Sequence, residues 1–305
     1  MAPPSSPRRA LPPRNGRAVS GTGSRSASRT GSRPASRTAR LSARRLPRIL
    51  WVPAGIGAAL LILPLAGLVI RAPWDRVAEL ALSQGTLEAL RLSLVTGLAS
   101  TALCLIFGIP LATILAASDG WPGIVRRLLR AGVTVPLVLP PVVGGIALLL
   151  LLGRRGLLGA PLLAATGFAL PFTTPAVVVA QTFVSMPFLV LAVEGALRGL
   201  DRRYEDAAAT LGASRWRAFS RITLPMIAPG IAAGAVLCFT RALGEFGATI
   251  TFAGSFPGVT QTLPIAAYLG LQSDPDTAIV LALLLLAVAV GVLLSLRDRW
   301  TGALR

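Results

Sequence analysis

The stretch YEDAAATLGASRWRAFSRITLP, residues 204–225, is a polar segment that lies between two strongly apolar segments of the chain. Lipid cannot satisfy its charges and free backbone groups, so the stretch is expected to lie outside a bilayer. Glu205 and Asp206 open a run of helix-favouring residues, where carboxylates suit the positive end of the helix dipole. Gly212 is expected to end that helix.

A second short helix is predicted after the glycine. Ser214 can cap its first turn, and Trp216 and Phe219, three residues apart, fall on one helical face. Pro225 is expected to break this helix, because a proline has no backbone N–H to donate. The whole stretch is therefore predicted to form a compact helix-turn-helix between two membrane spans.

The spacing of this stretch resembles the EAA motif of permease subunits of ATP-binding cassette (ABC) importers, which reads EAA, three residues, Gly, nine residues, then I-x-L-P. The chain departs from the motif once, with Asp where the family usually has Glu. The matching residues and one acidic neighbour are Glu205, Asp206, Ala207, Ala208, Gly212, Ile222, Leu224 and Pro225. The resemblance implies that the loop at 198–225 is the coupling element that docks on a cytoplasmic ATPase subunit. An ordinary amphipathic cytoplasmic loop is the alternative.

The composition is that of a polytopic membrane protein. The 305 residues are 53% hydrophobic and 14% charged, with a mean hydropathy of +0.70. A soluble core of this size could not hide so much apolar surface. We therefore expect an all-α membrane domain with six transmembrane helices at 49–305 and a tail at 1–48. The resemblance implies that this domain has the type I ABC importer permease fold.

The basic residues exclude several classes of chemistry. The chain has no His and no Lys, so all 30 basic residues are Arg. A phosphate-binding P-loop needs a Lys, and Ser-His-Asp catalysis, HExxH zinc sites and Lys Schiff bases need His or Lys. The chain is thus predicted to be no enzyme, with no cofactor or metal of its own. The resemblance implies that it is a transport subunit, with ATP and magnesium held by a partner ATPase.

The two cysteines, Cys104 and Cys238, lie in apolar segments far apart in the sequence. Without a CxxC spacing, both are interpreted as small buried apolar residues that bind no metal.

Residues 1–48 consist mostly of Ser, Arg, Pro, Gly and Ala and hold 12 of the 30 arginines. Such a composition cannot offset the entropy of ordering, so a disordered cytoplasmic tail is expected. A topology-setting tail, or residues upstream of the true start codon, is favoured over a nucleic-acid-binding or lipid-binding function, and no nucleic-acid partner is expected.

Six apolar segments are long enough to span a bilayer. They are residues 49–70, 92–117, 131–152, 175–197, 228–250 and 277–296. With the tail inside, the cytoplasmic loops and C-terminal end hold twelve arginines and the outer loops five, which follows the positive-inside rule. We therefore expect a multi-pass protein of the bacterial plasma membrane, with both termini and the 204–225 stretch cytoplasmic.

Two spans contain features that are costly in lipid. The third span holds Pro140 and Pro141 among further Pro and Gly residues, so non-helical backbone that lines the pathway, or a simple kink, is expected there. In the fifth span Arg241 and Glu245 are four residues apart and can pair on one helix face. One interpretation is that the pair only stabilises the structure. The other is that Arg241, Glu245 and Gly244 belong to an anion pathway and its gate.

The region 241–268, RALGEFGATITFAGSFPGVTQTLPIAAY, resembles the corresponding region of molybdate-type ABC permeases. Sulfate and thiosulfate permeases carry a related version. The sequence GVTQTLP at 258–264, together with LPPVVGGIALLLLLGRRGLLG at 139–159, favours molybdate or tungstate over sulfate.

The resemblance implies an assembly: a homodimer of permease chains in the lipid bilayer, two cytoplasmic ABC ATPase subunits, and an extracytoplasmic oxyanion-binding protein. A sulfate permease in a heterodimer is one alternative. An ATP-independent secondary transporter or channel is another.

Overall fold

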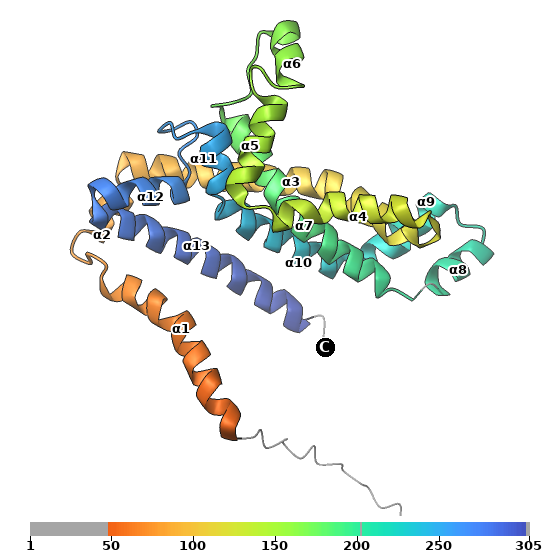
Figure 1. The fold of residues 1–305 in the computed structure, drawn as a ribbon. Coiled ribbons are helices and arrows are strands. Elements are labelled where there is room, and N and C mark those ends of the chain that lie inside the picture. Colours follow the sequence, from red (N-terminus) through yellow and green to blue (C-terminus); the bar gives the residue numbers. More distant parts are fainter. Residues whose placement is uncertain (1–47, 202, 303–305) are drawn as a thin grey trace, which may run out of the picture. The chain divides into compact units, whose positions relative to one another are not determined.

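The computed structural model describes residues 48–201 and 203–302, and this part of the chain is helical with no strand (Figure 1). The all-α prediction is confirmed. The elements are η1 (Arg48–Leu50), α1 (Trp51–Ile70), α2 (Val77–Ala81), α3 (Gln84–Ala117), η2 (Ser118–Gly120), α4 (Gly123–Val138), α5 (Pro141–Leu152), α6 (Gly159–Thr166), α7 (Thr174–Arg198), α8 (Arg203–Thr210), α9 (Arg215–Ala218), η3 (Phe219–Thr223), α10 (Leu224–Leu243), α11 (Gly247–Ala253), α12 (Leu263–Ser273) and α13 (Pro275–Gly302).

The chain divides into two compact units, residues 1–53 and 54–305. In the first unit only residues 48–53 are described, as η1 and the first residues of α1. The predicted tail at 1–48 therefore falls, except for Arg48, outside the described residues.

Five described helical runs are long and apolar enough to cross a membrane. They are Trp51–Ile70, Gln84–Gly120, Thr174–Arg198, Arg215–Leu243 and Pro275–Val292. Each corresponds to a predicted span. The second run begins eight residues before its predicted start at Leu92. The fourth run, which corresponds to the predicted span 228–250, ends at Leu243, seven residues before the predicted end.

The third span, predicted at residues 131–152, contains the break that its prolines predicted. The structure divides it between α4 and α5, whose axes meet at 118°. Leu139 and Pro140 between them are extended, with ψ of 135° and 133°. A residue that precedes proline avoids the helical region, and two prolines in a row impose this twice. The described residues therefore contain the six predicted spans when this bent pair counts as one.

The core of the second unit is built around α7, which packs against α3 and α10 (Figure 1). Small residues allow the close approach. A Cβ on Gly230 of α10 would lie 2.5 Å from the Cβ of Ala196 of α7, so only glycine fits at this crossing. Cys104 and Cys238 lie fully buried in the same apolar cluster, as predicted.

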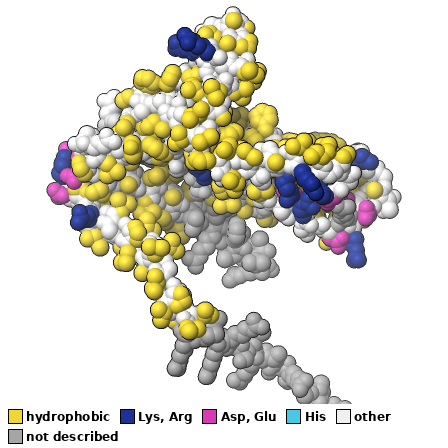
Figure 2. All heavy atoms as spheres, in the orientation of Figure 1, with side chains coloured by type: hydrophobic (Ala, Val, Ile, Leu, Met, Phe, Trp, Pro, Cys, Tyr) yellow, Lys and Arg dark blue, Asp and Glu magenta, His cyan; other side chains and the backbone are white. Residues whose placement is uncertain are grey.

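The surface is mainly apolar around the middle of the bundle. Figure 2 shows hydrophobic side chains over the region of α3 to α5, while charged side chains gather near α2, beside α6 and toward α8 and α9. Many large apolar side chains are exposed, among them Leu98, Phe107 and Leu150 at 61%, 58% and 71%. Such a surface requires lipid or a further protein chain to cover it.

Candidate functional site

The predicted helix-turn-helix is present as α8 and α9. Gly212 has a φ of +77°, the left-handed conformation that ends a helix, and the N–H of Ala213 donates to the carbonyl of Ala208 at 3.0 Å. A Cβ on Gly212 would meet nothing within 4 Å, so the glycine is required by its backbone conformation and not by space. The Ser214 hydroxyl accepts from the N–H of Arg217 at 3.3 Å, which confirms the predicted cap.

The predicted helix break at Pro225 is wrong. The chain is helical without interruption from Arg215 to Leu243, through α9, η3 and α10. Pro225 lies in the first turn of α10, where a missing N–H is tolerated. Just before it η3 is a π-helical turn, in which the N–H of Leu224 donates to the carbonyl of Phe219, five residues back. The proline therefore widens one turn and does not end the helix.

A hydrogen bond joins α8 to the start of the long helix. The Thr223 hydroxyl donates to Oε1 of Glu205 at 2.8 Å, and the Thr223 side chain is buried. The bond closes one wall of a cavity of about 420 Å³ between the hairpin and the ends of α3 and α7. It is lined by Thr113, Ala116, Ala117, Leu197, Leu200, Glu205, Asp206, Phe219 and Thr223. No pattern in the sequence indicated this bond, because its partners are 18 residues apart.

The motif residues gather around this hairpin but differ in exposure. Ala208 is buried, Ile222 and Leu224 are half-buried, and the others are exposed, namely Glu205, Asp206, Ala207, Gly212 and Pro225.

The outer face of the hairpin is unusually apolar for a polar loop. Leu211 and Trp216 are 88% and 74% exposed, and Tyr204 is 53% exposed. The ring of Trp216 lies 6.0 Å from that of Phe219, which confirms the predicted shared face. Large exposed side chains grouped in this way are typical of protein contact sites. Leu211 could not be identified from the sequence as a contact residue, because there it is one of several helix-favouring residues.

The predicted Arg241–Glu245 pair forms, with Nη1 of Arg241 2.6 Å from Oε2 of Glu245. The contact is an ion pair without hydrogen-bond alignment. Glu245 lies beyond the end of α10 and not on its face, and its Oε1 accepts from the N–H of Ala248 at 2.8 Å. Glu245 is 1% exposed, so one carboxylate both pairs with Arg241 and caps α11. Gly244 is the exposed C-cap of α10.

The break between α10 and α11 packs against the break between α4 and α5. A Cβ on Gly247 would lie 2.9 Å from the Cβ of Pro141, and one on Gly145 would lie 2.8 Å from the carbonyl oxygen of Ala248. The structure thus brings the neighbourhood of Glu245 and the predicted Pro140–Pro141 segment together. Pro141 is in the contact, while Pro140 is exposed beside it.

Comparison with known proteins places these features in context. The family of binding-protein-dependent transport system inner membrane components matches residues 108–302. The molybdenum transport system permease protein ModB of Mycobacterium tuberculosis is 50% identical over 254 residues, which cover 83% of this chain and 95% of that protein.

More distant relatives share the same architecture. The sulfate transport system permease protein CysW of Synechococcus elongatus is 39% identical over 233 residues, which cover 70% of this chain and 80% of that protein. A crystal structure of the bacterial alginate ABC transporter, in complex with an alginate pentasaccharide-bound periplasmic protein, matches with a TM-score of 0.63 at 21% identity. That match covers 81% of this chain and 91% of the solved chain, and it shows the fold.

Proposed function

The chain belongs to the family of binding-protein-dependent transport system inner membrane components, and we propose that it is the permease subunit of an ABC importer that carries molybdate, or its close analogue tungstate, across the plasma membrane. The observation that carries this proposal is the 50% identity with a molybdenum permease over 95% of that protein's length. The chain is a transport subunit and not a catalytic enzyme. Sulfate or thiosulfate is the second candidate, favoured by the 39% identity with a sulfate permease.

Energy enters this subunit through the α8–α9 hairpin. The exposed Leu211 and Trp216 side chains supply the apolar contact that an ATPase groove would bury, and the motif residues behind them set the hairpin's shape. Each of two ABC ATPases, which hold ATP and magnesium, docks on one such hairpin. The coupling residues in this assignment are Glu205, Asp206, Ala207, Ala208, Gly212, Ile222, Leu224 and Pro225.

The assembly is a homodimer with both termini in the cytoplasm and an oxyanion-binding protein on the outer face. The exposed apolar surface supports coverage by lipid and by a second copy. The arginine bias of the loops supports the orientation. The tail at 1–48 is outside the transport domain in this proposal.

The pathway runs past the place where the two helix breaks meet. Arg241 supplies positive charge, Glu245 holds it in position, and Gly244, Pro140 and Pro141 supply the non-helical backbone at which the bundle can open. The partial exposure of Arg241, 27% for its side chain, supports its access to an anion.

Uptake into proteoliposomes tests the proposal. The full assembly of permease, ATPase and binding protein should accumulate labelled molybdate in an ATP-dependent manner, and excess tungstate should compete better than sulfate. Preferential sulfate uptake would identify the second candidate. Uptake that follows an ion gradient and ignores ATP depletion would identify a secondary transporter and refute the proposal.

A further inference from the structure

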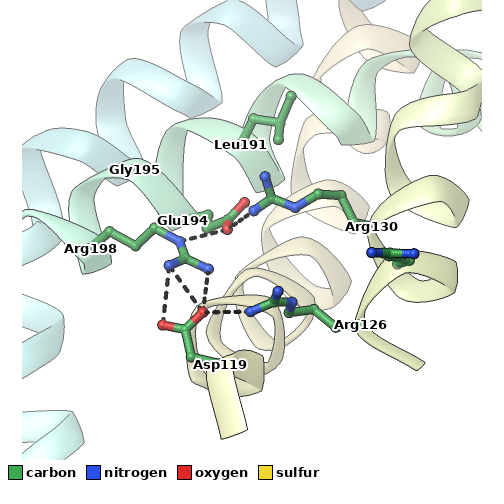
Figure 3. Close-up of a pocket in the computed structure, with 8 residues that line it drawn as sticks. Asp119, Arg126, Arg130, Leu191, Glu194, Gly195 and Arg198 are labelled. Atoms are coloured by element: carbon green, nitrogen blue, oxygen red, sulfur yellow. Dashed lines mark hydrogen bonds and ion pairs between the residues drawn. The ribbon is translucent and has the colours of Figure 1, made fainter. Parts of the chain in front are cut away.

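A basic pocket lies between α4 and α7, at the end of the bundle that carries the hairpin (Figures 1 and 3). Its volume is about 590 Å³ and it is open to the surface. The lining residues are Asp119, Arg126, Arg127, Arg130, Leu191, Glu194, Gly195 and Arg198. Four arginines against two carboxylates leave an excess of positive charge that nothing in the coupling function uses.

The two carboxylates hold three of the arginines in place. Glu194 is buried and pairs with Arg130 and, at 2.8 Å, with Nε of Arg198. Asp119 pairs with Arg198 at 3.3 Å and with Arg126 at 3.8 Å. Figure 3 shows these side chains pointing toward one another around the pocket. Each guanidinium has five N–H donors, so the network fixes the groups and leaves donors for an anion.

Arg127 is the exception in this pocket. It lines the cavity but makes no ion pair with any described residue. Its charge is therefore available to a ligand from outside the chain.

An apolar groove continues from the basic pocket between the same two helices. Its volume is about 440 Å³. It is lined by Leu111, Leu128, Leu129, Gly132, Val133, Pro136, Phe183, Met186, Pro187 and Val190. On α7 the groove extends from Phe183 to Val190, about 10 Å at the helical rise, and the basic pocket begins at the next residue, Leu191.

We propose that the pocket and groove together bind an acidic phospholipid, with its phosphate headgroup among the arginines and an acyl chain along the groove. A free anion would need the arginines but not the groove. α4 also presents apolar side chains outward that suit an acyl chain, because Ile124, Leu128 and Val138 are 63%, 65% and 80% exposed on the helix that carries three of the arginines. Basic pockets between transmembrane helices on the cytoplasmic side bind acidic headgroups in this way.

Two variants test the two halves of the site separately. Arg127→Gln removes a headgroup contact without breaking a described ion pair. Gly132→Leu fills the groove, and a Cβ at this position meets nothing within 4 Å, so the variant is expected to fold. The matched controls are Arg155→Gln, in the loop between α5 and α6, and Gly123→Leu, on the same helix outside the groove, where a Cβ also meets nothing within 4 Å.

The assay is native mass spectrometry of the purified transporter after exchange into bilayers of equal phosphatidylglycerol and phosphatidylcholine. The wild type and both controls should retain phosphatidylglycerol selectively. Arg127→Gln should weaken retention roughly fivefold, the value of one arginine near an acidic surface, and Gly132→Leu should abolish it.

Equal retention of the two lipids, or a loss in only one of the two variants, would overturn the proposal. So would displacement of phosphatidylglycerol by millimolar inorganic phosphate, which would identify a site for a free anion. Coverage of the groove by a second copy predicts no retained lipid and a weakened dimer in Gly132→Leu, and this too would refute it.

Discussion

Gly212→Val should weaken docking of the ATPase on the hairpin, and so lower both uptake and stimulated ATP hydrolysis, while leaving the permease in the membrane. Gly212 has a φ of +77° at the end of α8. Valine is strongly disfavoured in this conformation, whereas asparagine tolerates it. Gly212→Asn is therefore the matched control, since it adds a side chain of similar size without the same backbone cost.

The size of the effect follows from the surroundings of the glycine. A Cβ at position 212 meets nothing within 4 Å, so no clash contributes and the cost is the backbone term alone. A left-handed non-glycine residue costs about 1–2 kcal/mol, or somewhat more when β-branched. The bonds that hold the hairpin, the Ser214 cap and the Thr223–Glu205 contact, contribute about 1 kcal/mol each. The substitution thus offsets most of the local stabilisation and should lower the population of the docked hairpin by roughly 5- to 30-fold.

Molybdate-stimulated ATPase activity and molybdate uptake, measured on the same reconstituted assemblies, report this loss. In Gly212→Val both should fall by about an order of magnitude at limiting ATPase concentration, and excess ATPase should partly restore them. Gly212→Asn should retain most activity. Equal losses in the two variants would mean that the space around Gly212 matters and not its φ, and normal uptake in Gly212→Val would refute the coupling role of the hairpin.

Two further outcomes follow from described contacts, and a third concerns the predicted tail. Thr223→Val removes the donor to Glu205 and should weaken ATPase docking by roughly fivefold, measured as the ATPase concentration for half-maximal uptake, whereas Thr223→Ser should not. Arg241→Gln leaves Glu245 buried without its partner and should destabilise the permease by about 3–5 kcal/mol, seen in thermal unfolding. Arg241→Gln with Glu245→Gln should recover stability yet still transport poorly if Arg241 serves the anion, and normal transport in this double variant would leave the pair with a structural role only. Deletion of residues 1–48 should leave uptake unchanged, and a loss of uptake would support a function for the tail.

The hairpin could be predicted from the sequence because its signals are local. The left-handed conformation at position 212 favours glycine, a free N–H in the first turn of α9 favours Ser214, and both effects act within four residues. The ends of α1 and α7 follow from hydropathy for a similar reason, since each segment is apolar throughout and bounded by polar residues.

The features that the sequence did not predict depend on effects other than composition. Hydropathy averages over a window, so it predicts one apolar segment and gives no bend angle. Pro140 and Pro141 indicated a break in the helix, but not that the two helices would meet at 118°. The effect of Pro225 depends on whether it falls in the first turn of a helix or in its interior, and the π-helical turn that precedes it decides this. The basic pocket unites Asp119, Glu194 and four arginines from three elements, a grouping that only the tertiary packing of α4 on α7 creates.

Under the proposed function, the continuous helix from Arg215 to Leu243 carries movement of the hairpin along the bundle. Its 29 residues span about 43 Å, more than the roughly 30 Å of hydrocarbon. The helix is continuous through the π-helical turn of η3, and Arg241 in its last turn pairs with Glu245, whose Oε1 accepts from the N–H of Ala248 in α11. α11 in turn contacts α5 through Gly247 and Pro141, at the 118° bend where backbone hydrogen bonding is already interrupted. Movement therefore concentrates where the chain is least constrained, and the pathway proposed above lies at that point.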